Sequence, residues 1–132
     1  MSTKQVVVVR KDLKVRRGKE IAQGGHGFSN WLLELIIDSF QKNKPIYLNE
    51  AQKAWINGNI AKVVLQAENE EQLELVYSEA KKFGLYAHMV IDSGLTEFNG
   101  IPTKTVVAIG PDYVDRIDAI TGPNGKIPLK LY

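Results

Sequence analysis

The chain contains no cysteine among its 132 residues. This absence excludes disulfide scaffolds, thiolate zinc sites and cysteine nucleophiles, and it is compatible with a reducing compartment. Histidine is also scarce, because His26 and His88 are the only two and stand far apart in the sequence. A histidine-rich metal site is therefore not indicated, and we expect neither a metal nor another cofactor.

Long apolar runs are missing as well. No stretch approaches the roughly 18 apolar residues needed to span a bilayer, and the start MSTKQVVVVRKD lacks the apolar stretch of a signal peptide. We therefore expect a cytoplasmic protein without a membrane partner. With 44% hydrophobic and 24% charged residues, the composition is typical of a globular chain, and the length predicts one domain over residues 1–132.

Positive charge is concentrated at the amino-terminal end. The formal net charge of the chain is only +2, yet residues 1–20 hold seven Lys or Arg against Asp12 and Glu20. Such a concentrated positive field favours a polyanion partner, although a short basic run can also simply solvate an exposed loop. Charge alone does not separate these two interpretations.

Apolar patterning alternates between strands and helices. Strands are predicted over residues 4–10, 60–67, 85–92 and 105–110, and helices over residues 18–42, 50–56, 70–83 and from Pro111 to near Gly122. Strands separated by helices favour an α/β fold, a three-layer α/β/α domain with a small, mostly parallel sheet. The connection over residues 93–104 has no predicted helix, so a strand pair there can be antiparallel and the sheet mixed.

The long predicted helix has unusual glycines. Gly24, Gly25 and Gly27 lie within it, and each glycine costs a helix interior about 1 kcal/mol relative to alanine. Helical spacing also sets one polar row along this helix, formed by Lys19, Gln23, His26 and Asn30. The row can line a cleft. Alternatively, the glycines permit close packing against the sheet and His26 is an ordinary hydrogen-bonded side chain.

Asp92 ends a predicted strand and is followed closely by hydroxyl-bearing residues. A carboxylate there can organise an Asx turn. It can also serve chemistry, because ligand sites of such sheets lie beyond the carboxyl ends of the strands. If Asp92 and Lys19 meet at that edge, each favours the charged form of the other, and the pair can orient water or polarise a carbonyl.

Common catalytic motifs are missing. The sequence has no GxSxG elbow, HExxH motif, Walker loop or dinucleotide fingerprint. His88 lies inside a predicted strand and is interpreted as structural. Trp31 and Trp55 are not interleaved with basic residues, so they are interpreted as core or surface anchors.

Four segments resemble one family. VVRKDLKVRRGKEIAQGGHG is similar to the opening of the type 2 peptidyl-tRNA hydrolases, and DSGLTEF, TVVAIGP and IDAITG with LKLY are similar to later motifs of that family in the same order. The resemblance covers nearly the whole chain. It implies an α/β/α domain with a mixed sheet that hydrolyses, without a metal, the ester joining a peptide to the 3′ end of tRNA.

The resemblance also implies site residues. The family's catalytic positions fall on Lys19, Asp92, Thr96 and Thr105, with Gln23 and His26 lining the same cleft and Asn30 added by helical spacing. The residues expected to face tRNA phosphates are Lys11, Lys14, Arg16 and Arg17. Departures from the family pattern include Gly27 and Ser93, where alanine is usual, and PNGKIP before LKL.

Three functions remain open from the sequence. The chain is such an esterase, or a non-catalytic RNA-binding or protein-interaction domain of the same fold, or a hydrolase of another acylated RNA or nucleotide ester. Retention of the four implied catalytic positions favours an enzyme. The apolar positions Trp31, Leu33 and Ile37 are candidates for covering a second copy in a homodimer.

Overall fold

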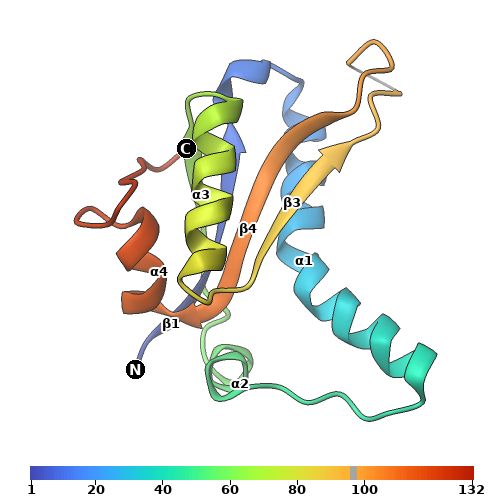
Figure 1. The fold of residues 1–132 in the computed structure, drawn as a ribbon, viewed down its shortest axis with the longest axis vertical. Coiled ribbons are helices and arrows are strands. Elements are labelled where there is room, and N and C mark those ends of the chain that lie inside the picture. The colour runs from blue at the N-terminus through green and yellow to red at the C-terminus, as the bar shows by residue number, and fades with distance from the viewer. Residues whose placement is uncertain (96–97) are drawn as a thin grey trace.

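The computed structural model describes residues 1–95 and 98–132. Its elements follow the order β1 (Thr3–Arg10), η1 (Lys11–Leu13, a 3-10 turn), α1 (Arg17–Lys42), α2 (Glu50–Asn57), β2 (Lys62–Ala67), α3 (Glu70–Lys82), β3 (Ala87–Asp92), β4 (Thr103–Tyr113) and α4 (Val114–Thr121). Helices α3 and α4 cover one face of the sheet, and α1 lies against the other (Figure 1). The predicted α/β/α layering is confirmed.

The four strands form a mixed sheet in the order β2-β1-β4-β3. β1 runs parallel to β2, with Val7 opposite Val64, while β4 runs antiparallel to both β1 and β3. The mixed sheet is confirmed, but the expectation of a mostly parallel sheet is corrected, since one of the three described strand pairs is parallel. The reason is the connection between β3 and β4, which turns back without a crossover helix, so that β4 enters the sheet between β1 and β3 in the opposite direction.

The run QVVVV in β1 forms the centre of the core. Val6 and Val8 belong to the cluster that faces α3 and α4, whereas Val7 and Val9 pack on the side of α1. All four are buried, as expected for a central strand covered on both faces. A Cβ added at Gly27 would lie 3.2 Å from Val106 Cγ1, so this glycine lets α1 approach the sheet closely.

Side-chain caps define the starts of two helices. The Asn49 side chain accepts a hydrogen bond from the Gln52 backbone N–H at 2.8 Å, and the Gln52 side chain accepts one from the Asn49 N–H, which forms the capping box that opens α2. Asn69 caps α3 by accepting from the Gln72 N–H at 2.9 Å. Local sequence signals therefore define both helix starts.

The predicted start of the last helix at Pro111 is wrong. β4 continues through Pro111 to Tyr113, and α4 begins at Val114. The extension exists because Tyr113 lies opposite Thr3 at the start of β1, a pairing that no local signal reveals. Beyond α4, the carboxyl-terminal tail reaches the sheet, since Leu131 forms an isolated bridge with Leu65.

The carboxyl-terminal half of α1 extends past the sheet (Figure 1). Trp31 is buried and packs edge-to-face against Trp55, with ring centroids 5.8 Å apart, so its apolar surface belongs to the core. Leu33 and Ile37 are exposed. Among the helices of the described residues, none is long and apolar enough to cross a membrane.

Candidate functional site

The first turns of α1 and the end of β3 bring Lys19 and Asp92 together. Lys19 Nζ lies 2.9 Å from Asp92 Oδ2, and the two side chains are 23% and 10% exposed. Gln23, one turn further along α1 and buried, donates from Nε2 to the same carboxylate oxygen at 3.3 Å. The two charges thus meet at the edge of the sheet in a partly desolvated position, where an ion pair is less screened than on the surface.

The second carboxylate oxygen of Asp92 organises the turn after β3. Asp92 Oδ1 accepts a hydrogen bond from the Gly94 N–H at 2.7 Å, which is an Asx turn. Gly94 has φ +83°, and a Cβ there would lie 2.4 Å from the Ile101 carbonyl oxygen, so the turn requires glycine. The structural and the functional interpretation of Asp92 therefore both apply, one on each oxygen.

These contacts also set the charge of Asp92. The hydrogen bond from Lys19, followed by that from the Gly94 N–H, lowers the pKa of the Asp92 carboxyl below its ordinary value, against the opposing effect of burial. Asp92 is consequently ionised at neutral pH and faces an ammonium group. This arrangement can hold a polar substrate group or a water molecule in a fixed field.

Thr105 lies on β4, which pairs with β3, the strand that ends at Asp92. In the pairing of β3 with β4, Val90 is opposite Val106 and Ile91 is opposite Lys104, so Thr105 is the additional residue of a β-bulge. Its buried hydroxyl donates to the Val90 carbonyl oxygen at 3.2 Å. Thr105 thereby fixes the strand that carries Asp92. Thr96 lies outside the described residues.

The rest of the predicted polar row extends away from the ion pair. His26 is exposed on the flank of α1 that carries Lys19. Asn30 joins a different cluster, because its Nδ2 donates to Tyr86 Oη and to Glu34 Oε1, each at 2.8 Å. Burial raises the pKa of Tyr86 to about 12. The row is therefore divided between the site and a hydrogen-bonded cluster further along the helix.

His88 belongs to this second cluster. Its Nδ1 lies 4.0 Å from Glu34 Oε1, at the limit of an ion pair, and burial lowers the pKa of the imidazole. Across residues 1–95 and 98–132, no three His, Asp or Glu side chains gather closely enough to hold a metal ion.

The predicted basic segment leads directly into α1. All four side chains predicted to face phosphates are exposed: Lys11, Lys14, Arg16 and Arg17. Lys11 forms an exposed ion pair with Glu68 at 3.0 Å, the kind of contact that contributes little and exchanges readily. Arg16 is the amino-terminal cap residue of α1 and precedes Lys19 by less than one turn. These exposed basic side chains and the ion pair are therefore close together in the chain.

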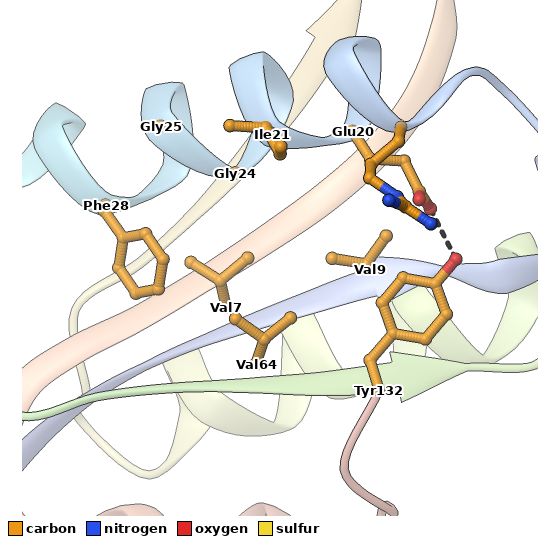
Figure 2. A pocket seen from close by; sticks show the side chains of 10 residues that line it. Val7, Val9, Glu20, Ile21, Gly24, Gly25, Phe28, Val64 and Tyr132 are labelled. Atoms are coloured by element: carbon orange, nitrogen blue, oxygen red, sulfur yellow. Dashed lines mark hydrogen bonds between the residues drawn. The ribbon is translucent and has the colours of Figure 1, made fainter.

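A hollow that the sequence did not predict lies on the opposite flank of α1. It has a volume of about 420 Å³ and lies between α1, β1, β2 and the last residue (Figure 2). Tyr132 closes one end by donating a hydrogen bond from its hydroxyl to Glu20. A Cβ added at Gly24 or Gly25 would meet no atom within 4 Å, so these two glycines leave room here. In the sequence, the only indication of this hollow is the presence of Gly24 and Gly25 inside a predicted helix.

Together these features define a small α/β/α protein with a Lys–Asp ion pair that follows an exposed basic segment. The sequence profile of the family described as "Peptidyl-tRNA hydrolase PTH2" matches residues 3–126, and the chain belongs to this family.

Relatives agree with this assignment. The chain is 40% identical to the peptidyl-tRNA hydrolase of Thermococcus onnurineus, over 90% of this chain and 92% of that protein, and 38% identical to that of Methanocaldococcus jannaschii, over 90% and 95%. Among solved structures, a protein of unknown function from Agrobacterium shares the fold, with a TM-score of 0.56 and 14% identity over 100% of this chain and 98% of that one.

Proposed function

We propose that this chain hydrolyses the ester bond between a peptide and the 3′ end of tRNA, and that Lys19 and Asp92 carry the reaction. The observation that carries the proposal is the contact between Lys19 Nζ and Asp92 Oδ2 at 2.9 Å, in a chain of the PTH2 family. In the reaction, water adds to the ester carbonyl carbon, the bond to the ribose oxygen breaks, and that oxygen takes up a proton. The products are a peptide carboxylate and a tRNA with a free hydroxyl.

The lowered pKa of Asp92 favours one of two roles for its carboxylate. A carboxylate that holds its proton weakly is a poor general base at neutral pH. Asp92 therefore orients Lys19 and the attacking water rather than removing a proton outright. The Lys19 ammonium stabilises the oxyanion that develops on the ester carbonyl, the interaction that matters most in acyl transfer.

Two further residues act through this pair in the proposal, and a third contacts the substrate. Gln23 holds Asp92 from the side of α1 by its 3.3 Å hydrogen bond, and Thr105 holds the end of β3 through Val90. Both are positioning residues. His26, exposed on the same flank of α1 as Lys19, is placed to contact the substrate. Thr96 stays a prediction from the resemblance.

The exposed basic segment supports tRNA as the carrier of the ester. Lys11, Lys14, Arg16 and Arg17 would contact backbone phosphates, which positions the substrate without reading its sequence. Since Arg16 precedes Lys19 by less than one helical turn, phosphates bound here leave the 3′ end near the ion pair. Localisation in the cytoplasm and a homodimer covering Leu33 and Ile37 stay predictions.

A turnover assay tests the proposal. It compares an N-acetylaminoacyl-tRNA, the corresponding aminoacyl-tRNA and a simple ester, each with wild-type protein and with Lys19→Met. Lys53→Met is a matched control, because Lys53 makes an exposed ion pair with Glu50 on α2. We expect turnover of the N-acetylated substrate that Lys19→Met abolishes and Lys53→Met retains. Binding of tRNA without turnover would instead indicate the non-catalytic alternative.

A further inference from the structure

The two edges of the sheet differ in their protection. At the β2 edge the carboxyl-terminal tail adds backbone hydrogen bonds, from the Gln66 N–H to the Lys130 carbonyl oxygen at 3.0 Å and from the Tyr132 N–H to the Val64 carbonyl oxygen at 3.1 Å. The outer edge of β3 has no strand partner within residues 1–95 and 98–132. β3 also contains neither proline nor lysine, the residues that commonly protect a free edge.

The backbone groups along this edge can be assigned from the pairing with β4. Alternate residues of an antiparallel strand direct both N–H and C=O toward the partner strand. The Gly110 N–H donates to the Tyr86 carbonyl oxygen, and the Thr105 hydroxyl donates to that of Val90, so even-numbered residues face β4. The bulge inserts its additional residue in β4, which leaves the alternation of β3 intact. The outward groups therefore belong to Ala87, Met89 and Ile91.

The free edge leads to the candidate site. β3 ends at Asp92, whose carboxylate pairs with Lys19, and the Asx turn at Gly94 diverts the chain there. Ile91, next to Asp92, is 57% exposed, so the edge is accessible up to the site. A chain paired with β3 in parallel would run along this edge and bring its carboxyl end to Asp92.

We infer that this edge binds the peptide of the substrate as an added strand, an inference that rests on the proposed function. The peptide lies parallel to β3, and its esterified carboxyl end reaches Lys19 and Asp92. Main-chain hydrogen bonds suit this task because they do not depend on side-chain identity, and the peptides released from stalled translation differ in sequence. From Ala87 to Ile91 the edge is roughly 13 Å long, enough for about four peptide residues.

A length series tests the inference with wild-type protein. Substrates carry one to six alanine residues, N-acetylated, on the same tRNA. We expect kcat/KM to rise about tenfold or more between one and four residues, because each added main-chain hydrogen bond contributes a factor of about two to ten, and then to level off. A kcat/KM that does not depend on length would overturn the inference.

Backbone methylation gives a sharper test. In a parallel pair, alternate peptide residues direct their N–H toward β3, so methylating one amide at a time in the four-residue substrate should lower kcat/KM severalfold at every second position. Equal effects at all positions, or sensitivity to side chains alone, would count against an added strand.

A variant of the edge supplies the complementary measurement. Ala87→Pro removes an outward N–H about five residues from Asp92, and β4 does not use that N–H. It should lower the ratio of kcat/KM for four-residue over one-residue substrates severalfold, whereas Ala87→Ser, which keeps the N–H, should retain the wild-type ratio. Thermal melting checks folding, and the methylated substrates test the inference even if Ala87→Pro does not fold.

The outcomes separate this inference from the proposed function. Hydrolysis of the one-residue substrate tests the activity itself, whereas only the length and methylation profiles test the edge. If light scattering shows a dimer that Ala87→Pro separates into monomers, and the length profile is unchanged, the edge is a dimer interface and the inference is wrong.

Discussion

The substitution Asp92→Asn separates the two oxygens of this carboxylate. Oδ1 accepts from the Gly94 N–H and Oδ2 accepts from Lys19 and Gln23. Asparagine keeps one acceptor oxygen, which can remain with Gly94. Its NH₂ group then faces two donors, so the substitution preserves the turn and removes the ion pair.

The stability cost follows from the contact that is lost. A hydrogen bond to a charged group contributes about 1.5–3 kcal/mol, and the pair is partly exposed, so we expect a loss of about 1–2 kcal/mol in the free energy of unfolding. For a chain of this length that corresponds to a fall in Tm of roughly 3–8 °C. The variant should therefore remain folded at 25 °C and bind tRNA nearly as well as the wild type.

The catalytic cost should be much larger than this. A group that orients an acid–base or oxyanion-stabilising partner contributes about 10²–10⁴-fold, so kcat should fall by on the order of a hundredfold or more. Lys19→Met should behave similarly. The double variant should be much less than additive, because either single change already disables the pair.

Single-turnover cleavage with enzyme in excess measures this without interference from product release. Circular dichroism melting and tRNA binding are recorded on the same preparations. Near-normal cleavage by well-folded Asp92→Asn would refute the catalytic assignment. Modest losses of stability and turnover that run in parallel would mean that Asp92 only shapes the turn after β3.

Three other perturbations address the charge, metal and pH dependence. Binding of tRNA should weaken steeply with salt, and replacing Arg16 and Arg17 with Ala should flatten the slope of log K against log salt; an unchanged slope would put the RNA surface elsewhere. EDTA should leave activity intact once magnesium effects on tRNA folding are controlled, and loss reversed by one specific metal would contradict this. Because the folded-state pKa of Asp92 is lowered, the stability it contributes is fully present above its ordinary pKa and is lost as pH falls through the lowered value, so the Tm values of wild type and Asp92→Asn should converge below about pH 4; a constant difference would count against the ion pair.

Local patterns predicted most of the elements of this fold. The four valines of β1 and the caps at Asn49 and Asn69 depend on neighbouring residues, and the structure has each of them. The strand directions and the extension of β4 past Pro111 depend on pairing between segments distant in the sequence. Periodicity contains no information about such pairing, which is why the parallel share of the sheet was overestimated.

The contact between Lys19 and Asp92 could be predicted because the topology of the sheet brings their two segments to one edge. Lys19 and Asp92 both belong to the edge where strands end, so the rule for open sheets places them together. Asn30 lies on the same flank of α1 as Lys19. It is nevertheless roughly 16 Å from Lys19 along the helix axis, because a helix rises about 1.5 Å per residue. A helical wheel shows only the angle of each residue around the helix axis, so it does not reveal this separation along the axis. The closure of the hollow by Tyr132 depends on the far end of the chain, and nothing in the sequence of α1 indicates it.

The glycines of α1 link the fold to the site. A helix with three interior glycines is weak in isolation, so its stability must come from packing. Gly27 permits that packing, because a side chain there would press on Val106 and hold the helix away from the sheet. Gln23 lies one turn earlier and reaches Asp92 at only 3.3 Å, near the limit of a hydrogen bond. A displacement of α1 by a few tenths of an ångström would therefore break this contact and loosen the carboxylate that holds Lys19, so close packing at Gly27 is a requirement of the site as well as of the core.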